Sequence, residues 1–197
     1  PLTTAAAASF EEFLLRPLQT NWTQVLDVAD LVSARLAPGR SAYLVLDSHP
    51  GATSPTDPRT QLATLAYYYL LADPQRTFLM FFGGYNPSSS WSEHWSPAAA
   101  VDVGQPLGSM RLFASGNDPA NPRLGYRIYA RDYSKALVLY KPLSYTLGVG
   151  NGTTDDATAT THSLGGTFRR LQADGTLGPP ITTITLRNGE GAILMRN

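Results

Sequence analysis

Two uninterrupted apolar segments stand out in the first half of the chain. Residues Ala42–Leu46 read Ala-Tyr-Leu-Val-Leu, and Thr77–Phe82 read Thr-Phe-Leu-Met-Phe-Phe. Such runs are typical of strands buried on both faces, as in parallel sheets. Between them, residues 56–58 (Thr-Asp-Pro) form a helix-start signal, and apolar residues recur at helical spacing to about Ala72. The pattern predicts two parallel strands joined by a right-handed helical crossover.

Two more helices are expected before this unit. Phe10–Leu15 is predicted to form a short helix that ends near Pro17. In Thr23–Leu36 the apolar residues recur with a period close to 3.6, and Pro38-Gly39 ends the segment. The first half therefore resembles an α/β arrangement.

The second half consists of short apolar segments separated by turns. Gly125–Ala130 and Lys135–Lys141 are predicted to pair as a hairpin. Three further strands are expected, with Asp-Gly and Asn-Gly turns between them, whereas residues 148–161 are expected to form a loop. These strands are Thr167–Gln172, Ile181–Leu186 and Gly191–Arg196. Short strands at this spacing predict an antiparallel sheet or sandwich.

Composition narrows the classes of function. The chain has 197 residues, 43% of them hydrophobic, and its formal net charge is zero. A neutral chain without a basic stripe argues against nucleic acid as the main partner. The sequence lacks an apolar run long enough to cross a membrane. The absence of cysteine excludes disulfides, thiolate metal sites and a cysteine nucleophile.

Three segments of the second half resemble the terminal β domain of glycoside-hydrolase-like proteins. The segment Arg131-Asp-Tyr-Ser-Lys-Ala-Leu-Val-Leu-Tyr-Lys-Pro142 is similar to the hairpin that opens that domain. His162–Leu171 resembles the next strand, and Ile184–Leu194 resembles the closing strands. The resemblance implies that the upstream strand–helix–strand unit corresponds to the last strands of the family's (β/α)8 barrel.

The resemblance predicts an α/β plus all-β fold in two domains. Residues 1–97 would be a partial barrel segment, and residues 98–197 a carboxyl-terminal antiparallel β-sandwich. A complete barrel needs about 250 residues, so the chain is expected to be a fragment or a reduced protein. Because an incomplete parallel sheet leaves an unpaired edge and apolar faces, we expect a homodimer to cover them.

The candidate chemistry lies after the two parallel strands, whose carboxyl ends share one edge of the sheet. Asp47 and His49 follow the first strand, and Asp47 is a candidate acid/base or ligand with His49 as its partner. Tyr85 and Asn86 follow the second strand and are candidates to bind polar groups of a ligand. A turn at each position is the alternative, and Asp57 is better explained as a helix cap than as part of the site.

A second cluster follows along the chain. Trp91 and Trp95 flank Glu93 and His94. Tryptophan faces stack on sugar rings, and a glutamate serves as general acid or base, with His94 beside it. Asp47 and Glu93 are the pair of carboxyls that can be assigned to one edge, as glycoside hydrolysis requires. The alternative is a loop whose two tryptophans anchor it on the sheet.

The sequence indicates a metal site less strongly. Asp155 and Asp156 lie in a short oxygen-rich loop of the kind that binds Ca²⁺, but their spacing does not fit an EF-hand, and loop solvation is the favoured explanation. Another divalent metal held by Asp47 with distant histidines is the second candidate.

Three functions remain open from the sequence. The first is a glycoside-hydrolase-like hydrolase, or a remnant of one, that acts on or binds a carbohydrate or another small molecule. The second is a metal-assisted hydrolase of small esters or lactones, and the third is a non-catalytic carbohydrate-binding or assembly module. The compartment stays unassigned, with a secreted or periplasmic location slightly favoured.

Overall fold

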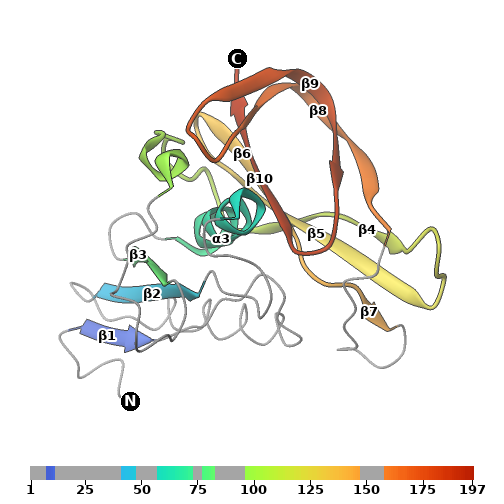
Figure 1. The fold of residues 1–197 in the computed structure, drawn as a ribbon, viewed down its shortest axis with the longest axis horizontal. Helices are drawn as coiled ribbons and strands as arrows, with labels where there is room; N and C mark the ends of the chain where they lie inside the picture. The colour runs from blue at the N-terminus through green and yellow to red at the C-terminus, as the bar shows by residue number, and fades with distance from the viewer. Residues whose placement is uncertain (1–7, 12–40, 48–56, 73–76, 83–95, 147–157) are drawn as a thin grey trace.

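The computed structural model describes residues 8–11, 41–47, 57–72, 77–82, 96–146 and 158–197. They contain a short parallel sheet, a larger antiparallel sheet and one long helix, α3 (Pro58–Leu71) (Figure 1). A single-turn 3₁₀ helix, η1 (Pro97–Ala100), precedes the antiparallel strands. No helix in these ranges is long and apolar enough to cross a membrane.

The short sheet has the order β1 (Ala8–Glu11), β2 (Ser41–Asp47), β3 (Thr77–Phe82), and both pairings are parallel. The prediction that the two apolar runs form parallel neighbours is confirmed. The helix expected from Phe10 is wrong at its start, since Phe10 and Glu11 belong to β1. Periodicity does not distinguish helix from strand in so short a segment.

The larger sheet is antiparallel throughout. Its six main strands follow the order β4-β5-β6-β10-β8-β9, with β7 beside β5. The strands are β4 (Arg111–Asn117), β5 (Leu124–Asp132), β6 (Ala136–Lys141), β7 (Tyr145–Thr146), β8 (Thr160–Leu171), β9 (Leu177–Leu186) and β10 (Glu190–Arg196). In Figure 1 the sheet curls so that β8 and β9 arch over β5 and β6.

The expected strands of the second half are present. The hairpin is β5–β6, and the three later strands are parts of β8, β9 and β10. Gly175 and Gly189 occupy the expected turns with φ of 83° and 70°, a backbone conformation that favours glycine. The pattern missed β4, and β8 begins at Thr160, inside the segment expected to be a loop.

Both faces of the central strands are buried. On one face, alternate residues of β6 pack against α3, and on the other face the remaining residues join the core inside the curl. All six residues of β6 are consequently buried, as are the middle residues of β10. The expected β-sandwich is compatible with this topology, because the two halves of the curl face each other across the inner core.

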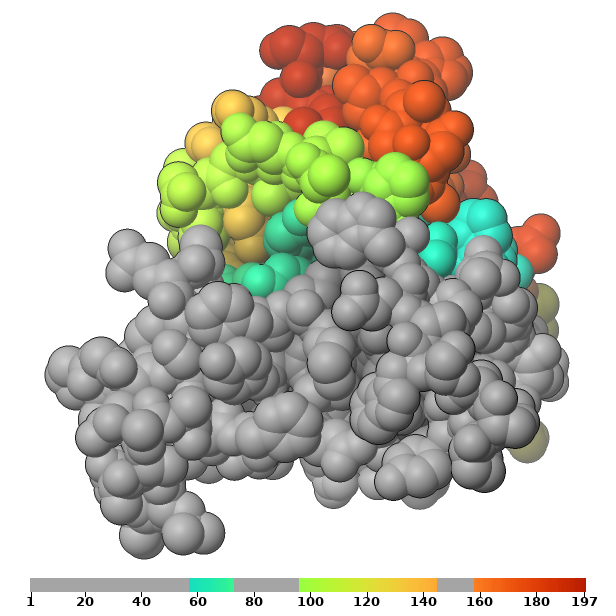
Figure 2. Space-filling view, turned by 60° about the vertical axis from the view of Figure 1, so that its left-hand side comes forward, coloured from blue at the N-terminus to red at the C-terminus, as the bar shows by residue number. Residues whose placement is uncertain are grey.

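Gly191 in β10 sets the distance between the helix and the sheet. A Cβ atom at this position would lie 2.5 Å from Ala66 Cβ, 2.9 Å from Ala63 Cα and 3.0 Å from Leu62 O. The helix therefore presents alanines to a glycine, and the two backbones come closer than larger side chains would allow. Figure 2 shows parts of α3, in turquoise, at the surface beside the antiparallel sheet.

The interpretation of the first half as a partial (β/α)8 barrel is wrong. The described chain is mainly antiparallel β, and α3 forms its core with β6 and β10 rather than an outer layer over a parallel barrel. The physical reason lies in the helix itself: residues 60–67 are all buried, including the polar Thr60, Gln61 and Thr64, so α3 is enclosed around its whole circumference. An apolar stripe along one side of a helix indicates a single packing surface, but α3 has no such stripe.

We expect Gly191→Ala to lower the free energy of unfolding by about 1–3 kcal/mol, because the added methyl group overpacks the contact with α3. The midpoint of urea denaturation measures the loss. Gly108→Ala is the matched control, since a Cβ there meets nothing within 4 Å. Equal midpoints for the two variants would show that α3 does not lie this close to β10.

Candidate functional site

The parallel pair β2–β3 brings the two candidate segments to one edge. Asp47, the last residue of β2, pairs with Phe82, the last residue of β3. The two strands therefore end side by side at the same edge of the sheet. This outcome confirms the shared edge on which the predicted site depends.

The other predicted site residues lie outside the described residues. The structure describes the backbone of Asp47 as part of β2 but gives no account of its side chain. The residues outside the described ranges are His49, Tyr85, Asn86, Trp91, Glu93, His94, Trp95, Asp155 and Asp156. Their roles remain predictions, and the structure neither brings them together nor separates them.

The amino end of α3 is capped as the sequence indicates. Asp57 Oδ1 accepts a hydrogen bond of 3.1 Å from Arg59 N, and Oδ2 accepts one of 3.1 Å from the Thr60 hydroxyl. Arg59 also forms an ion pair with Glu190 of β10, with Nε 3.1 Å from Oε1. Asp57 is thus a helix cap, and this end of α3 is tied to the antiparallel sheet.

The carboxyl end of α3 is held by Arg131 and Tyr133, at the end of β5 and just after it. Arg131 Nη1 donates to the carbonyl oxygens of Ala72 at 2.6 Å and Tyr69 at 3.2 Å, and its Nε donates to Gly108 O at 2.9 Å. The Tyr133 hydroxyl donates to Tyr69 O at 2.7 Å. These groups satisfy carbonyls that a helix end leaves without partners, and a cation is favoured there by the helix dipole.

The phenol of Tyr133 is a permanent donor in this contact. Burial raises its pKa to about 12, and the nearby Arg131 charge opposes this only in part. Burial also raises the pKa of Tyr69 to about 12. Both phenols therefore keep their protons at ordinary pH, and the attachment of α3 does not depend on pH near neutrality.

Lys141, the last residue of β6, belongs to a network of charged groups. The Lys141 side chain is fully buried, and its Nζ donates to Thr158 O at 3.1 Å and to Leu186 O at 3.4 Å. The ammonium group also lies 5.0 Å from the centre of the Tyr126 ring, a cation–π distance. Burial lowers the pKa of Lys141, and the charges of Asp118 and Glu190 act in the opposite direction.

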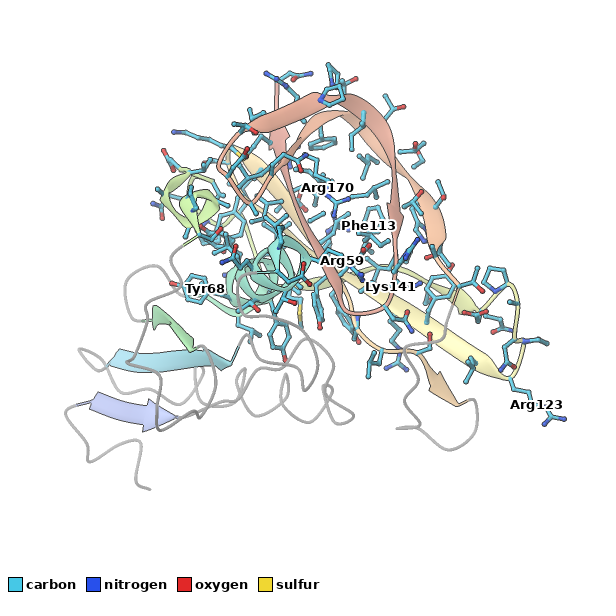
Figure 3. The ribbon with its side chains drawn as sticks, viewed as in Figure 1. Arg59, Tyr68, Phe113, Arg123, Lys141 and Arg170 are labelled. Carbon is cyan, nitrogen blue, oxygen red and sulfur yellow. The ribbon has the colours of Figure 1, made fainter. Side chains whose placement is uncertain are left out.

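Asp118 anchors the same network from the β4–β5 turn. Its carboxylate accepts from Thr158 N at 2.7 Å, from the Thr158 hydroxyl at 3.0 Å and from the backbone amides of Ala120 and Asn121. Burial by itself would raise the pKa of Asp118, but these four hydrogen bonds outweigh it and lower the pKa. Asp118 therefore remains ionised, and its charge acts on Lys141, which is labelled in Figure 3.

The network has no catalytic geometry of its own. Each of its charges is engaged by backbone groups, so its chemistry is structural. Within the described ranges, no three His, Cys, Asp or Glu side chains come together as a metal site would require. One feature of the sequence points to this network. Lys141 stands two residues after Leu139 and four after Leu137, so it falls on the same inner face of β6 as these leucines.

Comparison with protein-family models, curated proteins and solved structures finds no match for this chain. The functional assignment therefore depends on the residues and their placement.

Arg131→Lys should lower the free energy of unfolding by about 1–3 kcal/mol, because lysine keeps the charge but cannot reach the helix carbonyls and Gly108 O together. Chemical denaturation at neutral pH measures the change. Arg111→Lys is the control: Arg111 pairs with Asp132 on the surface, and its replacement should cost less than about 1 kcal/mol. A smaller loss for Arg131→Lys than for Arg111→Lys would contradict the capping role.

Asp118→Asn should also destabilise the protein, and the effect should depend on pH. The folded-state pKa of Asp118 is lowered, so its ionised form contributes stability above the unfolded pKa of about 3.9. That contribution is lost as the pH falls through the folded-state value. The difference in unfolding free energy between wild type and variant should thus be largest near pH 7 and shrink below about pH 4. A difference that does not change with pH would show that the carboxylate charge is unimportant.

Proposed function

We propose that the chain is a glycoside-hydrolase-like protein that acts on or binds a carbohydrate at the edge where β2 and β3 end. The single observation that carries this proposal is the parallel register that places Asp47 beside Phe82. Residues 83–95, with both tryptophans and Glu93, follow directly from that point.

The proposed chemistry needs two carboxyl groups facing each other across a glycosidic bond. Asp47 is assigned as the base or nucleophile and Glu93 as the acid. A separation of about 5–5.5 Å between them would give retention of configuration, and about 6.5–9.5 Å would give inversion. Trp91 and Trp95 would stack on sugar rings beside the bond.

The antiparallel sheet has a supporting role in this proposal. α3 connects the segment after β2 with the segment before β3, and it is held at both ends and at its centre by the antiparallel sheet. The likeness of segment 131–142 to the family's hairpin supports the same assignment, because this segment makes the attachment.

The experiment measures binding and turnover on the same chain. A panel of oligosaccharides is tested by calorimetry and by release of reducing ends, for wild type, Asp47→Asn, Glu93→Gln and Trp91→Ala. We expect each carboxyl replacement to lower turnover by about 10²-fold or more with binding retained, as for loss of a general acid or base. Trp91→Ala should weaken binding. Asp174→Asn, in the exposed β8–β9 turn, is the matched control.

The outcomes separate the alternatives. Binding without turnover by wild type would favour a carbohydrate-binding module over a hydrolase. Loss of turnover in EDTA with recovery on adding Ca²⁺ or Zn²⁺ would replace the two-carboxylate mechanism with a metal-assisted one. Neither binding nor turnover on any carbohydrate, or full turnover by Asp47→Asn, would refute the proposal.

A further inference from the structure

His162 lies where the curled sheet closes on itself. It belongs to β8, and its ring centre is 5.7 Å from that of Tyr126 in β5 and 6.3 Å from that of Phe113 in β4. In the strand order, β6 and β10 lie between these strands and β8. The contact therefore spans the inside of the curl rather than a neighbouring pair of strands, and Phe113 is seen there in Figure 3.

The surroundings of the His162 imidazole disfavour its protonation. Its Nε2 is buried and has no hydrogen-bond partner among the described residues. A protonated Nε2–H would be a charged donor without an acceptor, which is more costly than a neutral group in the same place. The Tyr126 ring offers little compensation, because the Lys141 ammonium already lies 5.0 Å from its centre.

The surrounding charges add to this cost. From β6, Lys141 is a buried cation near His162, and from β4, Arg111 lies over the Phe113 ring at 6.0 Å. Two anions, Asp118 in the β4–β5 turn and Glu190 in β10, act on Lys141. On β9 the residue paired with His162 is Ile184, which does not titrate.

We propose that His162 makes the closure of the curled sheet sensitive to acid, so that protonation of its imidazole loosens the contact of β4 and β5 with β8. Opening exposes the imidazole to water, which solvates the charge and moves it away from Lys141. α3 packs on the opposite face of the sheet and stays in place. The result is a conformational switch confined to one side of the sheet.

The direction of the titration agrees with the geometry. Burial, and secondarily the charge of Lys141, lowers the pKa of His162 below its usual value of about 6.5. A folded-state pKa below the unfolded value means that the stabilising contribution is complete above about pH 6.5. It is lost as the pH falls through the lower, folded-state value.

Amide hydrogen exchange on the full chain tests the switch. Protection factors of β4 amides, corrected for intrinsic exchange, should fall between pH 7.5 and pH 5, while those of α3 change much less. Because pH 5 lies about 1.5 units below the open-state pKa of about 6.5, the loss of protection can reach at most about 30-fold, and a folded-state pKa one unit below 6.5 gives a loss of about eightfold. His162→Gln should abolish the fall, whereas the matched variants His49→Gln and His94→Gln should retain it.

A second measurement keeps the test decisive if His162→Gln does not fold. An NMR titration of the wild-type imidazole, identified by its contacts to Phe113 and Tyr126, should give a pKa below 6.5, and Lys141→Met should raise it. A pKa at or above 6.5, β4 protection that is constant with pH, or an unchanged acid response in His162→Gln would overturn the proposal.

Discussion

The close approach of α3 to β10 at Gly191 is the constraint on which the described structure depends. Ala63 and Ala66 lie where a Cβ on Gly191 would have to be. The sheet therefore cannot exchange this position for a larger residue without moving the helix. Because the helix is also capped by Arg131 and paired to β10 through Arg59, its axis is fixed along its whole length.

The packing of α3 on one face of the antiparallel sheet gives that sheet a core on each face. β6 and β10 carry apolar residues on both faces, one set facing α3 and the other facing the inside of the curl. The outer core is held by close backbone packing and permanently protonated phenols, neither of which responds to pH near neutrality. Beside the inner core, Lys141 and His162 contact the ring of Tyr126, and Asp118 acts on Lys141; the pKa values of all three are shifted. The two faces should therefore respond differently to acid.

The sequence predicted those elements whose signal is local. Uninterrupted apolar runs identified β2 and β3 and their parallel pairing, and turn glycines with positive φ separated the last strands. The partner of α3 could not be predicted, because the helix is buried on all sides and its apolar residues do not single out one face. The strand β4 was missed since its residues are largely exposed and follow no clear alternation.

Only part of the candidate site could be predicted from the sequence pattern. The shared strand edge followed from the parallel pair, and Asp57 was identified as a cap. Lys141 and Arg131 were named only as parts of the segment 131–142, for its resemblance to a glycoside-hydrolase hairpin. Their roles depend on carbonyl groups far away in sequence, at Leu186 and Ala72, which no local pattern reports.

A double-mutant cycle between helix and strand tests the central claim most directly. Gly191→Ala and Ala66→Gly are made singly and together, and unfolding free energies are measured at neutral pH. If the backbones meet as described, Ala66→Gly removes the methyl group that lies 2.5 Å from the new Cβ. The double variant should then be more stable than the sum of the single losses predicts, by about 0.5 kcal/mol or more. Strictly additive losses would mean that the two positions do not touch and that α3 is not fixed to the sheet at this point.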